Sequence, residues 1–136
     1  MESKMKLRSV RGTHDLFGED IEKYNKINKI VTKVANLQNF AELQTPIFEF
    51  SELFYKPLGD QSDVVLKEMY SFKDRNEDNL TLRPEYTTPM IRAAITNNLL
   101  NELPLKIFGI GQMFRRERPQ KGRYRQFNQI NFEIFG

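Results

Sequence analysis

The chain has 136 residues, 39% of them hydrophobic and 29% charged, so its length and composition predict one folded domain and exclude a disordered segment. It contains no cysteine, which excludes disulfides, thiolate zinc sites and cysteine nucleophiles. The net charge is +3, and six cationic side chains with one carboxylate fall between Arg115 and Arg125, so this one basic window predicts an anion site or a nucleic-acid contact.

The first predicted element is an amphipathic helix from about Glu19 to about Gln38. Its apolar positions recur at helical spacing and are Ile21, Tyr24, Ile27, Val31 and Val34, with lysines between them. The next stretch, "FAELQTPIFEF", is rich in β-branched and aromatic residues. Because Pro46 cannot donate to a ladder, we expect an edge or interface strand there and not a central one.

A hairpin and a helix are expected in the middle of the chain. Two extended runs, Glu68 to Phe72 and Leu80 to Leu82, flank the turn-forming cluster "DRNEDN". Thr88 followed by Pro89 resembles an N-cap with proline at the first helical position. We therefore predict that a helix begins at Pro89.

The last two predicted strands run from Leu105 to Glu117 and from Arg125 to Phe135, and "RPQKGRY" joins them into an antiparallel hairpin. Side chains alternate across a strand, so odd and even positions lie on opposite faces. We expect the even face to be core, with Phe108, Ile110, Phe114, Ile130, Phe132 and Ile134. We expect the odd face to carry a site, with Met113, Arg115, Glu117, Arg125, Phe127, Gln129, Asn131 and Glu133. Gly109 and Gly111 on that face are expected to let a ligand approach the sheet.

The residues on the odd face suit a nucleotide and a small zwitterion. Guanidinium groups such as Arg115 bind phosphate oxygens with two hydrogen bonds, and Phe127 can stack on a base. Gln129 and Glu133 offer acceptors to an ammonium group. The chain contains no Walker-type motif, and "GIGQMF" lacks the third glycine of a dinucleotide fingerprint. Spacing alone leaves a phosphate site of this kind and a basic hairpin that contacts RNA about equally open.

Five stretches, in the same order along the chain, resemble the class II aminoacyl-tRNA synthetases and, within them, the histidine-specific members. "MFRRERPQKGRYRQFNQ" is similar to motif 2, "TPIFEFSELF" to the motif 1 region, and "LRPEYTTP" to the first segment that contacts histidine. "VRGTHDLF" and "DVVLKEMYSFKDR" also resemble the family. The resemblance implies an α+β fold with an antiparallel catalytic sheet flanked by helices, and a homodimer through the region near Pro46.

The resemblance also implies a two-step reaction with ATP and Mg²⁺, in which histidine becomes histidyl-adenylate and is then transferred to tRNA(His). Arg115 would be catalytic at the α-phosphate. The implied ATP-binding residues are Arg115, Glu117, Arg123 and Phe127. The implied histidine-binding residues are Glu85, Thr87, Gln129 and Glu133. The implied tRNA contacts are Arg118, Gln120 and Lys121, and no metal ligand is assigned to a protein side chain.

Some features depart from the family pattern. Tyr86 and Asn131 stand where glycine is common, and Asn128 where histidine is usual. Tyr86 would crowd the amino-acid pocket. We expect residues 1–136 to be the N-terminal part of the catalytic domain, without motif 3 and the anticodon-binding domain, and to make no adenylate in isolation.

Two other functions stay open. A synthetase-like regulatory subunit of an ATP phosphoribosyltransferase would keep the fold, but retention of Arg115 and Arg123 argues against it. An RNA-binding module would bind tRNA with no response to ATP. The start "MESKMKLRSV" lacks a signal-like apolar run, and no stretch approaches the roughly 20 apolar residues of a membrane span. We therefore expect no membrane contact and a cytoplasmic location.

Overall fold

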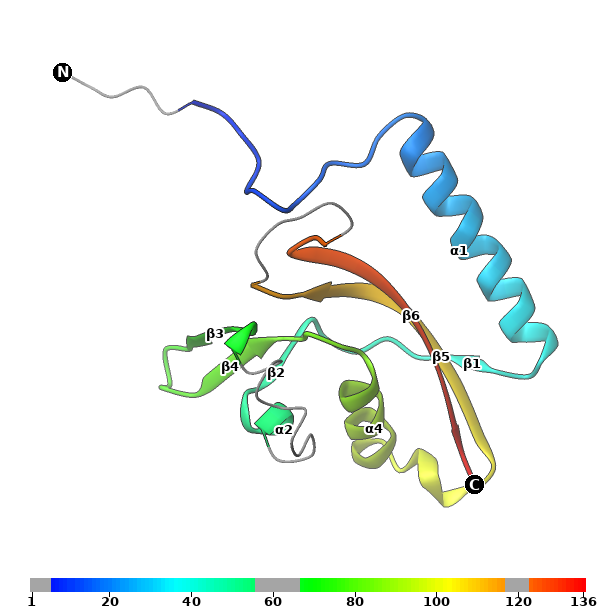
Figure 1. The fold of residues 1–136 in the computed structure, drawn as a ribbon. Helices are drawn as coiled ribbons and strands as arrows, with labels where there is room; N and C mark the ends of the chain where they lie inside the picture. Colours follow the sequence, from blue (N-terminus) through cyan, green and yellow to red (C-terminus); the bar gives the residue numbers. More distant parts are fainter. Residues whose placement is uncertain (1–5, 56–66, 117–122) are drawn as a thin grey trace.

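Two three-stranded sheets organise the chain, whose computed structural model describes residues 6–55, 67–116 and 123–136 (Figure 1). The first sheet contains, in spatial order, β1 (Ala41–Glu42), β5 (Leu105–Phe114) and β6 (Gln126–Phe135). The second contains β2 (Phe48–Phe50), β4 (Asn79–Leu82) and β3 (Tyr70–Lys73). β1 pairs with β5 in parallel, and the other neighbouring pairs are antiparallel. The predicted α+β class with an antiparallel sheet is confirmed, and the parallel pair is an addition to it.

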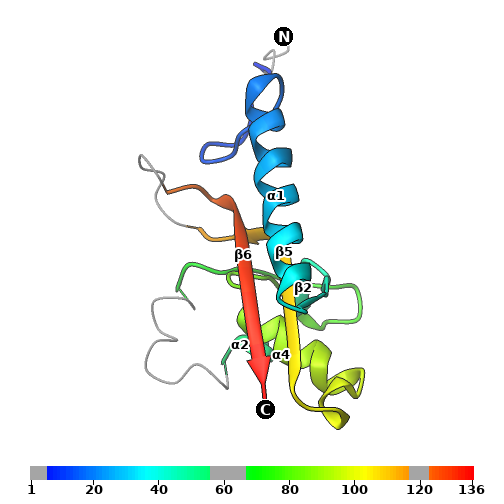
Figure 2. The ribbon, with the colours of Figure 1, turned by 90° about the vertical axis from the view of Figure 1, so that its right-hand side faces the viewer.

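Helices lie on both sides of the β5–β6 hairpin. Among the described residues, the helical elements are α1 (Glu19–Leu37), the short α2 (Glu52–Tyr55) next to β2, α4 (Thr87–Thr96) and the 3₁₀ helix η2 (Leu99–Asn101). Figures 1 and 2 show α1 on one side of β5 and β6 and α4 on the other. The helix predicted from about Glu19 to about Gln38 is confirmed by α1. Within the described ranges, no helix is long and apolar enough to cross a membrane.

The start of α4 differs from the prediction. The helix begins at Thr87, with Tyr86 as its N-cap residue, so the prediction that Thr88 caps it is wrong. Both carboxylate oxygens of Glu85 lie 3.2 Å from the backbone nitrogen of Thr88 and accept its hydrogen bond. A carboxylate just before the helix therefore replaces a threonine hydroxyl as the cap. Pro89 becomes the third helical residue, where an N–H would have no partner within the helix.

The two predicted hairpins are confirmed by β3–β4 and by β5–β6. The stretch around Pro46 also follows the prediction, because β2 is an edge strand and the proline precedes it. A bidentate ion pair ties this edge to α4: Arg92 Nη2 lies 2.8 Å from Glu49 Oε2, and its Nε lies 3.1 Å from Oε1.

The predicted core face of β6 is wrong. Ile130, Phe132 and Ile134 are 41%, 40% and 66% exposed. The buried cluster instead lies on the odd face, and its members are Tyr86, Met90, Ile107 and Met113. The cause is the position of the helices. α4 and Tyr86 cover the odd face, whereas Figure 2 shows α1 in front of β5, with β6 to one side of this helix.

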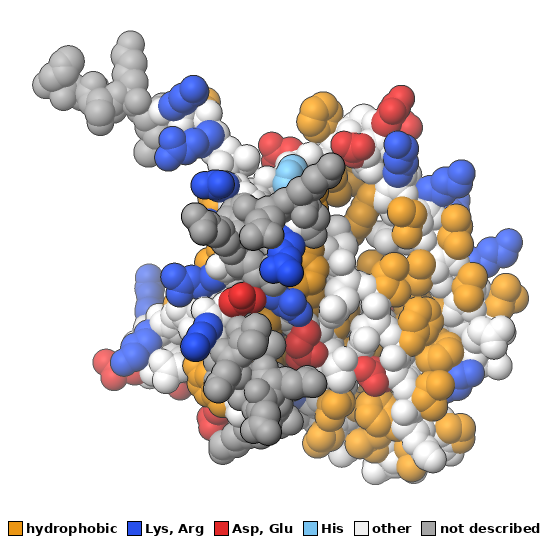
Figure 3. All heavy atoms as spheres, viewed as in Figure 1, with side chains coloured by type: hydrophobic (Ala, Val, Ile, Leu, Met, Phe, Trp, Pro, Cys, Tyr) orange, Lys and Arg blue, Asp and Glu red, His pale blue; other side chains and the backbone are white. Residues whose placement is uncertain are grey.

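The even face is not bare along its whole width. Phe108 in β5 is fully buried, and its ring stacks on Phe132 with 5.7 Å between centroids. Phe40, which follows α1, contacts Phe132 edge-on at 4.9 Å. The apolar side of α1 itself is half exposed at Ile27 and Val34. Figure 3 shows many hydrophobic side chains at the surface in this part of the molecule.

Candidate functional site

The odd face of the β5–β6 hairpin meets the segment that connects β4 to α4. Hydrogen bonds between described residues join them, among them the following three. The backbone N–H of Phe114 donates to the carbonyl of Arg83 at 2.9 Å, and the Nε–H of Arg115 donates to the carbonyl of Pro84 at 3.0 Å. The backbone N–H of Tyr86 donates to Gln129 Oε1 at 2.9 Å. The connecting segment is thereby held against both strands.

Arg115 and Phe127 face one another, as the alternation of side chains predicts. Met113 pairs with Phe127 in the hairpin register, so Arg115 follows on the same face. The guanidinium carbon of Arg115 lies 5.2 Å from the centre of the Phe127 ring, within the range of a cation–π contact. The bond to the Pro84 carbonyl fixes the orientation of the guanidinium plane. This pair can present a cation and an aromatic surface to the same ligand.

Gly109 and Gly111 do not leave room for a ligand, so that prediction is wrong. A Cβ atom on Gly109 would lie 2.8 Å from the ring of Tyr86 and from the carbonyl oxygen of Leu43. A Cβ on Gly111 would overlap the guanidinium of Arg83. The space above both glycines is filled by side chains of the protein itself, and Tyr86 is only 1% exposed.

The residues expected to bind histidine are partly engaged within the chain. The Glu85 carboxylate accepts the backbone N–H of Thr88 and so caps α4. A carboxylate at a helix N-terminus is favourable whether or not it also binds a substrate. The oxygen of the Gln129 side chain accepts the Tyr86 backbone N–H, and its second lone pair can still accept from an ammonium group. Thr87 is the first residue of α4 and is half-buried.

Glu133 lies further along the odd face of β6 and is half-buried. Its Oε1 accepts a hydrogen bond of 3.0 Å from Asn131 Nδ2. The same Asn131 nitrogen lies 3.2 Å from Met90 Sδ. Asn131, a departure from the family pattern, thus connects this carboxylate to α4.

Arg123 and Arg125 precede β6, at the end of the hairpin where β5 finishes. Arg123 is exposed, and Arg125 is half-buried with its backbone N–H bonded to the carbonyl of Gly12 at 2.8 Å. Glu117, Arg118, Gln120 and Lys121 fall outside the described residues. Among the described residues, no group of three His, Asp or Glu side chains is placed to hold a metal ion.

Sequence reasoning missed Arg83, which is 4% exposed and lies beneath the site. The only local signal was weak: Arg83 follows Thr81 by two residues, a spacing that would place both side chains on one face if the strand extended past Leu82, and the sequence did not indicate that Thr81 is buried. The charge of the residue hid this pattern, because arginine is rarely buried.

Comparison with known proteins agrees with this geometry. Residues 70–136, which contain β3 to β6 and α4, match the family described as tRNA synthetase class II core domain (G, H, P, S and T). A curated histidine–tRNA ligase of Ehrlichia chaffeensis is 50% identical over 131 residues, which are 96% of this chain and 31% of that protein. The chain is thus similar to the class II tRNA synthetases, over residues 70–136 by the family match and over nearly its whole length by the curated relative.

Solved structures of this family have the same fold. The chain matches apo histidyl-tRNA synthetase of S. aureus with a TM-score of 0.78 and 33% identity, over 95% of this chain and 29% of that one. A Bacillus halodurans structure titled as an ATP phosphoribosyltransferase regulatory subunit/histidyl-tRNA synthetase matches with a TM-score of 0.79 and 21% identity, over 98% and 33%. That second likeness concerns the fold alone. The chain spans about a third of the length of the curated synthetases that it matches.

Proposed function

We propose that these residues form the N-terminal part of the catalytic domain of a histidine–tRNA ligase. The observation that carries the proposal is the pairing of Arg115 with Phe127, 5.2 Å apart, on the strand face that also bears Gln129 and Glu133. Identity of 50% to a histidine–tRNA ligase over nearly the whole chain supports the same substrate. Because the chain covers 31% of that relative, the activity is proposed for the complete protein that contains these residues.

In the first proposed step, a carboxylate oxygen of histidine attacks the α-phosphorus of ATP. The bond between the α-phosphorus and the bridging oxygen breaks, and pyrophosphate leaves with the electron pair. Arg115 stabilises the negative charge that develops on the α-phosphate oxygens, which is commonly the largest catalytic term in such sites. Phe127 and Glu117 hold the adenine, and Arg123 binds the γ-phosphate. Mg²⁺ enters with ATP as part of the substrate, and no protein ligand is assigned to it.

In the second proposed step, a terminal ribose hydroxyl of tRNA(His) attacks the acyl carbon of the adenylate. The bond between that carbon and the phosphate oxygen breaks, AMP leaves with the electron pair, and the hydroxyl proton passes to a phosphate oxygen of the leaving AMP. Glu85 and Glu133 attract the ammonium group of histidine because two carboxylates create a negative field at that end of the face. Thr87 and Gln129 complete this pocket. Arg118, Gln120 and Lys121 contact the acceptor end of the tRNA.

We also propose a homodimer formed through the β2 region. β2 is an edge strand, and Ile47, Phe48 and Phe50 are 47%, 46% and 57% exposed. An exposed apolar edge of this kind is typical of a surface that another chain covers. Since tRNA is the proposed partner, the cytoplasm is the proposed location. Sedimentation velocity on the complete protein measures the oligomeric state.

The proposal is tested by reversing the charge of Arg115 in the complete protein. Arg115→Glu should lower histidine-dependent ATP–pyrophosphate exchange by about a thousandfold or more, because it places a negative charge beside the α-phosphate. The matched control is Arg116→Glu, since Arg116 is exposed and its guanidinium lies 5.9 Å from the ring of Tyr70 on β3. This control should lose less than about threefold, as most surface changes do.

Other outcomes would identify the other functions. Exchange that survives Arg115→Glu at the level of the control contradicts the proposed mechanism. An unaltered protein that binds tRNA without any exchange, and without a change in tRNA affinity on addition of ATP, is an RNA-binding module. Binding to an ATP phosphoribosyltransferase, again without exchange, would identify the regulatory subunit.

A further inference from the structure

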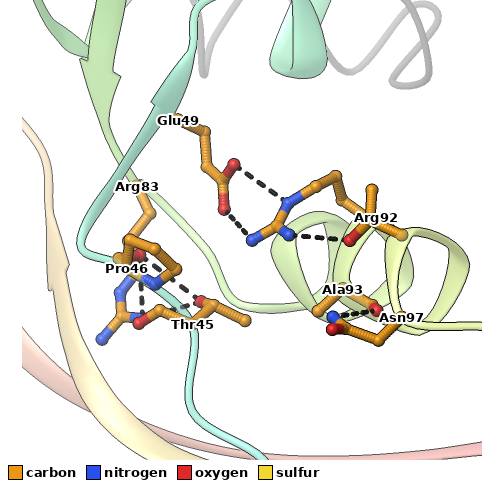
Figure 4. A network of polar contacts seen from close by, with 8 residues as sticks. Thr45, Pro46, Glu49, Arg83, Arg92, Ala93 and Asn97 are labelled. Carbon is orange, nitrogen blue, oxygen red and sulfur yellow. Dashed lines mark hydrogen bonds and ion pairs between the residues drawn. The ribbon is translucent and has the colours of Figure 1, made fainter. Parts of the chain in front are cut away.

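Arg83 is an arginine buried at the junction of the two sheets. It is 4% exposed, and its described acceptors are three backbone carbonyls and one hydroxyl. Nε–H donates to the carbonyl of Gln112 in β5 at 2.8 Å. Nη1 donates to the carbonyl and to Oγ1 of Thr45, each at 3.0 Å, and lies 3.4 Å from the carbonyl of Pro46 (Figure 4).

Burying the charged Arg83 side chain costs free energy, and packing alone does not explain why an arginine stands at this position. Burying a charged group is unfavourable unless it is well paired, and here the described partners are neutral oxygens. The planar guanidinium supplies donors in fixed directions, so it can bond two separate stretches of backbone at once. Arg83 thereby connects the chain between β1 and β2, at Thr45 and Pro46, to strand β5 at Gln112.

The same guanidinium also packs against Tyr86, which borders the candidate site. Its carbon lies 4.5 Å from the centre of the Tyr86 ring, and it occupies the space that a side chain at Gly111 would need. The Tyr86 ring therefore packs against both Arg83 and β5. Because the Tyr86 backbone N–H bonds to Gln129, the position of this ring sets the position of a residue proposed to bind histidine.

The backbone at Arg83 and Pro84 is hydrogen-bonded to β5 and to Arg115, the proposed catalytic residue. The carbonyl of Arg83 accepts from Phe114, and the carbonyl of the next residue, Pro84, accepts the Nε–H of Arg115. A shift of Arg83 would therefore move both the Pro84 carbonyl and the Tyr86 ring. The first orients the group at the proposed α-phosphate, and the second orients the proposed histidine pocket.

We infer that Arg83 is a positioning residue for the candidate site, acting through Tyr86 on Gln129 and through the Pro84 carbonyl on Arg115. The inference rests on the proposed function for its kinetic test, and on the hydrogen bonds alone for a second test by NMR. Arg83 touches neither substrate in this scheme.

The kinetic test is Arg83→Lys in the complete protein, measured by histidine-dependent ATP–pyrophosphate exchange. Lysine keeps the charge but not the planar set of donors. We expect kcat/KM for histidine to fall by about tenfold to a hundredfold, with a higher KM as well as a lower kcat, because small misplacements of catalytic groups cost that much. A partly unfolded enzyme would lose kcat at an unchanged KM, so the rise in KM separates positioning from loss of folded protein.

Thr81→Val is the matched control for a change in buried polar packing. Thr81 is fully buried, and its hydroxyl bonds to Ser71 in β3 and to Ser51, the residue after β2. It should leave KM for histidine unchanged, even where it lowers the amount of folded protein. Equal changes in KM for Arg83→Lys and Thr81→Val, or a KM in Arg83→Lys within about twofold of the original, would overturn the inference.

Two further variants test the route through Tyr86. Gly111→Ala should reproduce the rise in KM, because its methyl group displaces the guanidinium without altering Arg83 itself. Arg83→Met and Tyr86→Leu should be strongly non-additive in kcat/KM, since each removes one member of the same contact. Full additivity would contradict the assigned route.

A readout that does not depend on activity separates this inference from the proposed function. The Nε–H resonance of Arg115 reports its hydrogen bond to the Pro84 carbonyl. It should shift in Arg83→Lys and stay in place in Thr81→Val. If the unaltered protein shows no exchange, the proposed function fails, and this resonance alone decides the inference: an unmoved Arg115 signal in Arg83→Lys would overturn it.

Discussion

The two faces of the β5–β6 hairpin have the same alternating pattern and opposite surroundings. On the odd face, α4 and Tyr86 cover the strands, and the cluster that contains Met90 and Met113 is buried. On the even face, Ile130, Phe132 and Ile134 remain 41%, 40% and 66% exposed. The more polar face of β6 is thus the covered one. Alternation separates the faces of a strand, but the elements packed against it decide which face becomes core.

The covered face is also the one on which polar side chains are fixed in place. Gln129 and Arg115 each bond to the backbone of the segment between β4 and α4. A binding site needs side chains held in one geometry, and packing together with hydrogen bonds supplies that. The candidate site therefore adjoins the core cluster of this sheet, on the same strand face.

The largest difference between the faces should come from Met90→Ala, which empties part of the buried cluster. Met90 is 0% exposed, so truncation should lower the free energy of unfolding by about 2–5 kcal/mol. Ile95→Ala on the same helix is the control, because Ile95 is 57% exposed and should cost much less. Urea denaturation followed by circular dichroism measures both. Equal losses would mean that α4 does not cover the odd face in this way.

A smaller effect is expected from Gly109→Ala. The new methyl group would lie 2.8 Å from the Tyr86 ring and from the Leu43 carbonyl, so overpacking should cost about 1–3 kcal/mol of unfolding free energy. In a Tyr86→Leu background the added cost should fall, since one of the two contacts is gone. An unchanged free energy of unfolding in Gly109→Ala would instead support the prediction that the space above Gly109 is open to a ligand.

The smallest effect should come from Ile134→Ser on the even face. Because Ile134 is 66% exposed, the free energy of unfolding should change by no more than about 0.5 kcal/mol. The same urea titration measures it. A loss above about 2 kcal/mol would indicate that this face is covered in solution, and the contrast between the two faces would disappear.

Much of the fold could be predicted from local signals. The helix at Glu19–Leu37 follows from apolar residues at helical spacing, and both hairpins follow from extended runs around turn-forming residues. The shared face of Arg115 and Phe127 follows from the two-residue period of a strand and the hairpin register. Local signals were weaker at the start of α4, where Glu85 takes over the capping role expected of Thr88.

The contents of the space above Gly109 and Gly111 could not be predicted in this way. Arg83 and Tyr86 lie more than twenty positions away in the chain, and nothing in the pattern around the glycines indicates them. The use of the Gln129 side-chain oxygen by the Tyr86 backbone is equally non-local.

The sequence by itself determined the elements, the pairing of the hairpin strands and which side chains share a face, because periodicity and turn chemistry act over a few residues. The tertiary structure alone decided which face is buried, what fills the space above the glycines and why Arg83 is internal. Those outcomes depend on contacts between segments distant in the chain, such as Arg83 with Thr45 and Gln112. Whether a strand face is buried depends on the segments that pack against it, and the sequence of one strand does not specify those segments.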